Sequence, residues 1–359
     1  MAGGGKSLKR GASLPLAVVG GLKLQAMSSP TATVVIVAYQ SGAFLQPCVD
    51  ALAAQDFADF EAVVVDNASS DGSVEGLRLP DPRFRIRPMG YNSGFAVANN
   101  VAARETTGEF LVLLNPDAVA DPAWLGRLVA AAHAMPQAAS FGSTQLRLDE
   151  PDVLDGIGDV WHAAGLAWRA GEGWPAARAP GDGEIFGPCG AAALYRREQF
   201  LAVGGFDERF FCYCEDVDLA ARLRGLGARS YRVGAAVVRH AGSGISGRRS
   251  DFTLFHGHRN RIWVFVKNTP GPWFWLLLPY HLTFNLLYLG SALRRGVFPP
   301  IWRAYVAALG GLGPMLAERK VLARSRRTPF SQMLRAMAWT PWAPFRREMH
   351  PRHGVEVQS

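Results

Sequence analysis

Three strongly apolar runs in this chain each stop at a cluster of carboxylate, amide or hydroxyl side chains. The runs are TVVIVAY at 33–39, FEAVVVDNAS at 60–69 and EFLVLLNPD at 109–117. Each is short, aliphatic and bounded by turn residues, which predicts a buried strand. The stretches at 42–54 and 93–107 between them predict helices. This alternation with short connections predicts an α/β fold with a mainly parallel sheet flanked by helices.

In such a sheet, ligands bind beyond the carboxyl ends of the strands. Tyr39, Asp66 and Asp117 fall at these ends. The rest of the chain extends the pattern. We expect a further strand at 83–88, between the second and third runs. Asp121 as N-cap, followed by Pro122, predicts the start of another helix. Beyond it we expect loops and short strands at 140–185, then strand, helix, Gly turn and loop at 189–211, a helix at 215–227, and one or two strands at 228–240.

The first polar cluster, DNASSDGS, follows the second run. Asp66 ends that strand, and its carboxylate could accept hydrogen bonds from a nucleobase or a ribose. Asp71 lies in the serine-rich turn that follows. The alternative is an ordinary Asx or Ser turn, which the same composition favours.

The segment GYNSGFAVANN opens the second predicted helix. Around Asn92 and Gly94, free backbone N–H groups at the helix start could bind a phosphate or a sugar hydroxyl. Phe95 could wall a pocket, and Asn99 lies one turn later on the helix. The alternative is a capped surface helix.

Two further acidic clusters carry most of the chemistry. In LLNPDA, Asp117 projects from the end of a rigid strand and suits Mg²⁺ or Mn²⁺ together with phosphate oxygens, although it could only cap a turn. In EDVDL, Asp216 is the first candidate for a catalytic base and Glu215 the second. The alternative is that these acids, with Asp218, complement the helix dipole. His240 is a candidate metal ligand, or a structural histidine.

Charge is concentrated at the end of the chain. From Arg294 onward, twelve Lys/Arg and three Glu give +9, so the rest carries about −1 of the net +8. Ahead of this tail, residues 268–293 are uncharged, long enough to span a membrane. Prolines and the basic tail count against a single span, which predicts interfacial attachment to anionic lipid, with a re-entrant hairpin including 300–316 as the alternative. We expect no nucleic-acid partner.

The four cysteines show no disulfide or zinc spacing, which predicts free thiols in a reducing compartment. Residues 1–30 resemble a signal peptide only weakly and are expected to be disordered, with Met27 a candidate true start. We therefore divide the chain into this extension, a catalytic domain at 31–268, and an apolar then basic helical region at 269–359.

The motifs TVVIVAYQS, VVVDNASSDGS, GYNSGFAVANN, FLVLLNPDA and GGFDERFFCYCEDVDL occur here in one order. In that order they resemble the family 2 glycosyltransferases of the GT-A fold, a Rossmann-like architecture, and bacterial rhamnosyltransferase-like members that build cell-surface polysaccharide in particular. The resemblance implies an inverting transferase of the hexosyltransferase class. It would move a sugar, rhamnose among the candidates, from a nucleotide-diphosphate donor to a saccharide or polyprenyl-linked acceptor.

The resemblance also assigns roles to residues. It implies that Asp216 is the base, with Glu215 still the second candidate, and that Asp117, with His240 at the position of a metal-binding histidine in some relatives, holds a divalent cation, Mg²⁺ or Mn²⁺. Asn115 departs from the family's DxD pattern at its first position, which puts strong two-carboxylate metal binding in doubt. The expected donor-binding residues are Tyr39, Asp66, Asn67, Asp71, Asn92, Gly94, Phe95, Asn99, Asn115 and Asp117. The expected location is the cytoplasmic face of the cell membrane, and homo-oligomerisation is left open.

Two other functions compete with this reading. A nucleotide-dependent oxidoreductase needs a GxGxxG turn after the first strand, and AYQSGAF at 38–44 does not supply one. A non-catalytic, membrane-associated protein that binds a sugar or nucleotide on the same fold would keep the donor site without the base.

Overall fold

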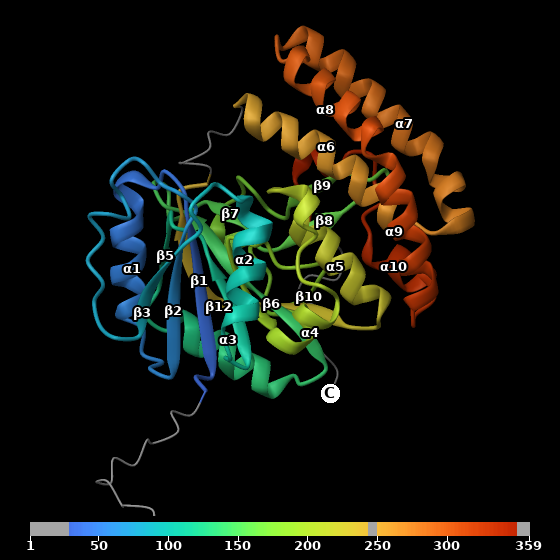
Figure 1. The fold of residues 1–359 in the computed structure, drawn as a ribbon. Coiled ribbons are helices and arrows are strands. Elements are labelled where there is room, and N and C mark those ends of the chain that lie inside the picture. Colours follow the sequence, from blue (N-terminus) through green and yellow to red (C-terminus); the bar gives the residue numbers. More distant parts are fainter. Residues whose placement is uncertain (1–28, 243–249, 350–359) are drawn as a thin grey trace, which may run out of the picture.

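The computed structural model describes residues 29–242 and 250–349, and a large mixed sheet covered by helices on both faces forms its centre (Figure 1). The strand order is β10-β12-β6-β11-β4-β1-β2-β3, with β5 pairing to β12 and β7 to β6, and β8 and β9 form a separate pair. The strands are β1 Ala32–Ala38, β2 Phe60–Asp66, β3 Phe84–Pro88, β4 Phe110–Leu114, β5 Ala118–Ala120, β6 Ala138–Arg147, β7 Leu154–Gly156, β8 Asp159–Trp161, β9 Ala167–Arg169, β10 Gly183–Ile185, β11 Ala192–Arg196 and β12 Arg229–His240.

Helices cover both faces of the parallel half, β3-β2-β1-β4. All of β1 is buried, with Val34 and Ile36 packed toward α1 and α3 and Val35 and Val37 toward α2 and α4. This double burial explains why these strands are apolar throughout instead of alternating. The helices are α1 Leu45–Ala53, α2 Gly94–Glu105, α3 Trp124–Ala134, α4 Arg197–Ala202, α5 Glu215–Gly225, α6 Asp251–Asn268, α7 Gly271–Arg294, α8 Phe298–Gly310, α9 Leu312–Ser325, α10 Phe330–Ala336 and α11 Ala343–Arg346, with 3₁₀ turns at Gly42–Phe44, Ala176–Arg178 and Glu208–Phe210.

The other half of the sheet differs from the sequence expectation. The α/β class is confirmed, but β11 runs antiparallel to both β4 and β6, while β12 is parallel to β6. The ten-residue strand β6 lies inside the segment expected to hold loops and short strands. Its sequence, AASFGSTQLR, has no apolar run, and it is buried because β11 and β12 flank it. The hydroxyl of Ser140 donates a hydrogen bond to the hydroxyl of Ser230 on β12, at 2.8 Å.

The predicted cap of the third helix is also wrong in detail. Helix α3 begins at Trp124 with Ala123 before it, and no side chain caps it. Asp121 instead accepts a hydrogen bond from Arg239 of β12 at 2.7 Å. The carboxylate is therefore engaged across the sheet and is not available to the helix N-terminus.

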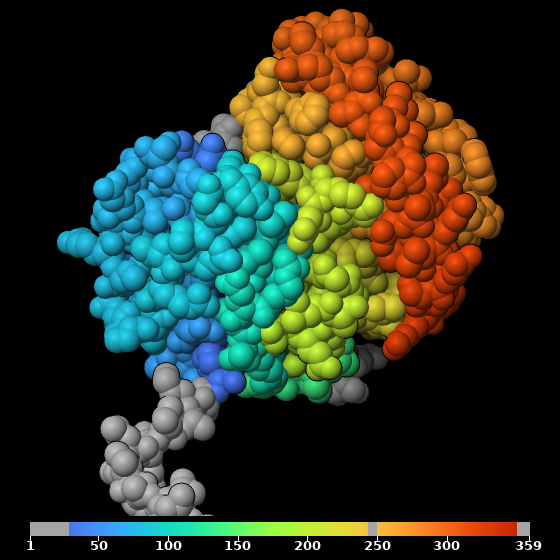
Figure 2. Space-filling view, in the orientation of Figure 1, coloured from blue at the N-terminus to red at the C-terminus, as the bar shows by residue number. Residues whose placement is uncertain are grey.

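The C-terminal helices, α6 to α10, pack against the rest of the molecule and do not extend away from it (Figures 1 and 2). Trp263 and Phe265 of α6, Phe274 of α7 and Phe330 of α10 share one buried cluster with residues of α5 and β8. A buried ion network reinforces this contact, since Lys267 of α6 lies 2.9 Å from Asp218 of α5 and 2.6 Å from Asp207.

Among the described residues, one helix, α7, is long and apolar enough to cross a membrane by length and composition. Of its apolar 18-residue stretch, 28% is buried inside the protein. Most of the exposed large hydrophobic side chains also lie in the C-terminal region: 13 of the 18 in the described chain follow residue 270. The predicted interfacial attachment therefore has an apolar surface to act through. Of the predicted disordered extension, residues 1–28 lie outside the described chain.

Candidate active site

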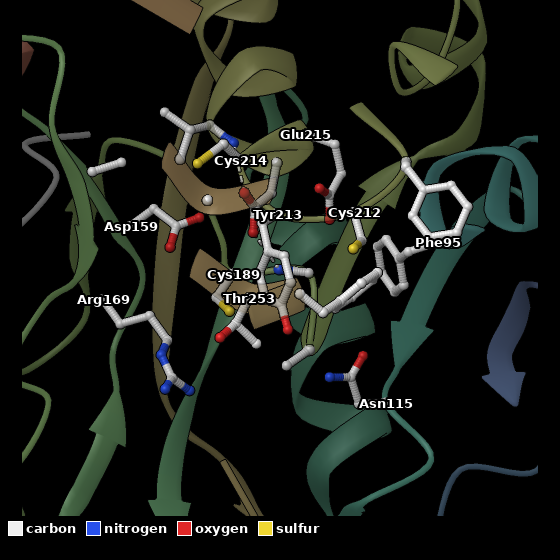
Figure 3. A pocket seen from close by; sticks show the side chains of 18 of the residues that line it. Phe95, Asn115, Asp159, Arg169, Cys189, Cys212, Tyr213, Cys214, Glu215 and Thr253 are labelled. Atoms are coloured by element: carbon white, nitrogen blue, oxygen red, sulfur yellow. Dashed lines mark hydrogen bonds between the residues drawn. The ribbon is translucent and has the colours of Figure 1, made fainter. Parts of the chain in front are cut away.

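A cavity of about 1090 Å³ lies at the carboxyl ends of the central strands. Its walls come from the ends of β1, β4 and β12, the start of α5, the β8–β9 hairpin and one face of α6. Figure 3 shows side chains from several of these segments around one space, among them Asn115, Asp159, Arg169, Glu215 and Thr253. Of the residues expected from sequence, those that line it are Tyr39, Asn67, Asn92, Gly94, Phe95, Asn115, Asp117, Glu215, Asp216 and His240.

Strand pairing brings Asp117 and His240 together. The antiparallel register of β5 on β12 sets His240 opposite Ala118, so Asp117 comes beside the imidazole. The Oδ1 of Asp117 lies 3.1 Å from His240 Nε2, and both side chains are buried. On the other side of the ring, His240 Nδ1 lies 2.7 Å from Oδ2 of Asp155, on β7. A carboxylate therefore fixes the histidine from behind, as in many metal-binding histidines.

The electrostatics of this histidine depend on its two carboxylates. Burial alone would lower the pKa of His240, but the hydrogen bonds to Asp117 and Asp155 outweigh it and raise the pKa to about 9. The imidazole is therefore protonated at neutral pH, and its Nε2 could bind a metal ion only after losing that proton. The side-chain nitrogen of Asn115 lies 3.2 Å from His240 Nε2. Rotating this amide by 180° would turn its oxygen, instead of its nitrogen, toward Nε2.

Asp216 lies in the first turn of α5 and faces the cavity. Its Oδ2 accepts from the Gly190 N–H at 3.1 Å and its Oδ1 from the Val217 N–H at 2.8 Å. Burial raises the pKa of Asp216, while these backbone donors act in the opposite direction by stabilising the carboxylate. A carboxylate held in this way is poised to accept a proton from a substrate hydroxyl.

Asp159 of β8 is a partner of Asp216 that the sequence did not reveal. Carboxylate oxygens of these two residues and the sulfur of Cys189 all lie within 4.8 Å of one another. Burial, and then the charge of Asp216, raise the pKa of Asp159 well above its usual range. The interaction between the two groups raises the pKa of Asp159 and acts to lower that of Asp216, so Asp159 is the one of the pair that keeps its proton. Oδ2 of Asp159 has no donor among the described residues, as a neutral carboxyl group permits.

The other two acids of EDVDL have different environments. Glu215 is buried at the cavity, its Oε2 has no donor among the described residues, and burial together with the Asp216 charge raises its pKa well above the usual range. Asp218 points away and bonds Arg222, Lys267 and Asn268. Asp218 therefore joins α5 to α6, and Asp216 remains the better base.

The loop before α5 is held in an unusual conformation. Phe211, Tyr213 and Cys214 have φ of 67°, 69° and 65°, a region that non-glycine residues rarely adopt. The side-chain nitrogen of Asn260, on α6, lies 2.9, 2.8 and 2.7 Å from the carbonyl oxygens of residues 210, 212 and 213. This one amide stabilises the conformation that positions the first turn of α5.

Some of the expected donor-binding residues line the cavity and others do not, and Asn67 and Gly94 are among those that do. Asn67 accepts from both the backbone N–H and the hydroxyl of Ser93, which ties the end of β2 to the start of α2 at the cavity. Gly94 has φ +81°, and a Cβ there would lie 2.6 Å from the Phe211 ring, so only glycine fits.

Asp66, Asp71 and Asn99 do not line the cavity. Asp66 accepts from the Ser69 N–H at 2.9 Å, and Asp71 accepts from Gly42 and Ser73, as in the simple turns considered as alternatives. Asn99 is buried and donates to the Phe95 carbonyl within α2.

Sequence reasoning missed Asp155, Asp159, Asn260 and the cavity residue Arg261. The first two come from a segment without periodicity, so only the folded strands bring them to the site. The α6 residues have a detectable signal, because Leu254, Gly257, His258 and Arg261 follow the i, i+3, i+4, i+7 spacing of one helix face, and all four line the cavity.

Comparison with known proteins adds to this geometry. The sequence model described as Glycosyl transferase family 2 matches residues 33–203. An N-acetylglucosaminyl-diphospho-decaprenol L-rhamnosyltransferase of Mycobacterium tuberculosis is 28% identical over 297 residues, covering 73% of this chain and 94% of that protein. The O-antigen biosynthesis protein RfbC of Myxococcus xanthus is 32% identical over 219 residues, covering 56% of this chain and 16% of that larger protein.

Solved structures share the fold. TarS of S. aureus superposes with a TM-score of 0.53 at 16% identity, covering 82% of this chain and 52% of that one. GalNAc-T7, solved with UDP, GalNAc and Mn²⁺, has a TM-score of 0.52 at 16% identity, covering 66% of this chain and 48% of that one. At these identities the likeness supports the architecture alone.

Proposed function

This chain is a family 2 glycosyltransferase of the GT-A fold, and from that premise we propose that it is an inverting enzyme with a lipid-linked acceptor. It would transfer a sugar, rhamnose being the first candidate, from a nucleoside diphosphate to a polyprenyl-diphosphate-linked saccharide in cell-surface polysaccharide synthesis. The observation that carries the proposal is the convergence of Asp117, His240 and Asp216 on one cavity.

Asp117 and His240 are the residues proposed to hold a divalent cation. Their facing oxygen and nitrogen are 3.1 Å apart, a separation that two ligands of one ion can have, and Asp155 orients the ring. The mixed O/N set suits Mn²⁺ better than Mg²⁺, which prefers oxygen ligands. A cation bound there would neutralise charge on the departing nucleoside diphosphate.

The cluster of Asp159, Cys189 and Asp216 is a poorer cation site. Burial and the nearby carboxylates raise the pKa of the Cys189 thiol well above its usual value, so it stays protonated and a weak ligand. The Asp159–Asp216 pair shares a proton instead, which leaves Asp216 available for acid–base chemistry.

Asp216 is proposed to act as the base in a single displacement. The acceptor hydroxyl oxygen bonds to the anomeric carbon from the face opposite the leaving group, and its proton passes to Asp216. The bond between the anomeric carbon and the phosphate oxygen breaks, and its electron pair leaves with the nucleoside diphosphate. Neutral Asp159, donating to Asp216, keeps the base ionised until that transfer.

The C-terminal helices are proposed to bring the enzyme to the cytoplasmic face of the membrane. They hold most of the exposed large apolar side chains of the described chain, and the segment from Arg294 onward carries +9. Apolar and cationic groups together favour an anionic lipid interface, where a polyprenyl-linked acceptor resides.

A donor screen tests the function. Purified protein would be given nucleoside-diphosphate sugars carrying rhamnose, glucose, N-acetylglucosamine or mannose. The acceptor would be N-acetylglucosaminyl-diphospho-decaprenol, and each reaction would be run with and without Mn²⁺. We expect release of nucleoside diphosphate that needs both acceptor and cation, and fastest release from the rhamnose donor. Donor binding without turnover of any sugar would favour the non-catalytic reading.

A further inference from the structure

Arg261 is a buried cation at the helical end of the cavity, since it lies on α6 and bonds side chains of α7 and α8. It lies on the cavity-facing side of α6, and its side chain is 93% shielded from solvent, with 7% exposed. Its Nη2 donates to Oδ1 of Asn285 at 2.8 Å and to the hydroxyl of Tyr305 at 2.7 Å. Its Nε and Nη1 have no acceptor among the described residues.

No carboxylate in the described chain pairs with Arg261, unlike the other cavity arginines. Arg169 pairs with Asp155 and Glu172, and Arg347 with Glu172 at 3.3 Å. Removing a guanidinium from water without an anion is costly, and leaving its N–H groups without acceptors adds to that cost. A buried arginine that keeps two nitrogens free is therefore set up for an anion that the protein itself does not supply.

The surroundings of Arg261 indicate which kind of molecule brings that anion. The guanidinium lies 4.6 Å from the ring centroid of Tyr288, which belongs to the apolar helix α7 and also lines the cavity. On the same helix, Leu287 and Leu286, one and two positions before Tyr288, turn away from the cavity and are 59% and 68% exposed. An anion at Arg261 thus lies beside a helix that lines the cavity with Tyr288 and presents an apolar outer face, as a lipid carrying a diphosphate requires.

We propose that Arg261 is the binding site for the diphosphate of the lipid-linked acceptor, with α7 receiving the first units of its apolar chain. This inference rests on the proposed function. A donor diphosphate carries the same chemistry, but the Asp117–His240 site at the strand ends is already proposed for it. The guanidinium is suited to phosphate because it presents several donors and is weakly hydrated.

Binding of farnesyl diphosphate, farnesol and UDP with Mn²⁺ distinguishes the sources, measured by calorimetry on the full chain. In Arg261→Gln we expect affinity for farnesyl diphosphate to fall about 10- to 100-fold, the range for charge-assisted hydrogen bonds. Farnesol and UDP should bind as before. Arg261→Lys, which keeps the charge, should lose less.

Arg104→Gln is the matched control, because Arg104 is an exposed helical arginine that does not line the cavity. It should leave all three affinities unchanged. Weaker UDP binding with unchanged farnesyl diphosphate binding in Arg261→Gln would assign the site to the donor and overturn the proposal. Unchanged binding of all probes, or a parallel loss of all with a lower melting temperature, would also overturn it.

The proposed function can fail separately. If the wild type transferred no sugar from any donor but bound farnesyl diphosphate through Arg261, the subsite would stand and the transferase assignment for this acceptor would fall. With N-acetylglucosaminyl-diphospho-decaprenol as acceptor, Arg261→Gln should raise the acceptor KM by a similar factor and leave the donor KM unchanged.

Discussion

The two ends of the cavity are built in opposite ways. At the strand ends, Asp117, His240 and Asp155 hold one another at 3.1 and 2.7 Å, and the strand register fixes their positions. At the helical end, Arg261 has neutral partners, and two of its nitrogens lack an acceptor in the part of the chain that the structure describes. We proposed a cation for the first end and an anion for the second, so each would be complementary to a different charged group. Asp216 lies on α5, which meets both the sheet and α6.

The largest expected effect comes from removing the proposed base, Asp216. Asp216→Asn should lower kcat by about 10²- to 10⁴-fold, the usual contribution of a general base. The amide oxygen can still accept from either the Gly190 or the Val217 N–H, while its NH2 group faces the other, so the melting temperature should fall slightly and the protein should stay folded.

Glu215→Gln is the comparison for this variant, since Glu215 is the second candidate. We expect it to retain more activity than Asp216→Asn. A greater loss in Glu215→Gln, with Asp216→Asn near the wild-type rate, would exchange their roles.

The next effect concerns the strand end alone. Changes to residues that only orient a metal ligand weaken affinity about 10- to 100-fold, and loss of the Asp117 carboxylate should cost at least as much. Mn²⁺ binding to Asp117→Asn, followed by electron paramagnetic resonance, checks this. Farnesyl diphosphate binding should not change. If Asp117→Asn bound Mn²⁺ as tightly as the wild type, the cation would have to lie elsewhere.

A smaller effect concerns the lipid side. Leu286→Ser with Leu287→Ser should weaken binding to vesicles containing anionic lipid by about 10-fold, because two exposed leucines would no longer enter the interface. Cosedimentation measures this, with Leu79→Ser, exposed but outside the C-terminal region, as control. Equal pelleting of the double variant and the control would remove α7 from the membrane contact.

The smallest effect is a shift in pH dependence. Loss of a donor to a carboxylate raises its pKa, so Asp159→Ala should raise the pKa of Asp216 and move the acid limb of kcat/KM to higher pH. Asp159→Asn keeps an N–H donor and should leave that limb close to its wild-type position. A limb that moves to lower pH in Asp159→Ala would mean that Asp159 acts as a like charge and not as a donor.

The parts of the fold that could be predicted from sequence are those with a local residue pattern. The strands β1, β2 and β4 are apolar because both of their faces are buried, and that pattern is local. Asp117 was a candidate because it closely follows β4, and Asp216 and His240 were candidates because they lie at the start of α5 and the end of β12. The residue pattern also supported simple turns at Asp66 and Asp71, and in the structure these carboxylates accept from nearby backbone N–H groups.

What escaped prediction depends on long-range contacts. Asp155 and Asp159 belong to short strands whose positions are set by β6 and by the hairpin partner β9. Asn260 and Arg261 act on residues distant in sequence, the carbonyls near Tyr213 and the side chains of Asn285 and Tyr305. A polar helix sequence such as HGHRNR does not reveal those partners.

The anomeric configuration of the product tests the central claim most directly. One base, Asp216, opposite one leaving group predicts a single displacement and therefore inversion. With a donor that turns over, the one-bond carbon–hydrogen coupling at the anomeric carbon of the new linkage should show the configuration opposite to that of the donor. Retention would contradict the account, because it requires a second displacement and a nucleophile on the other face of the sugar.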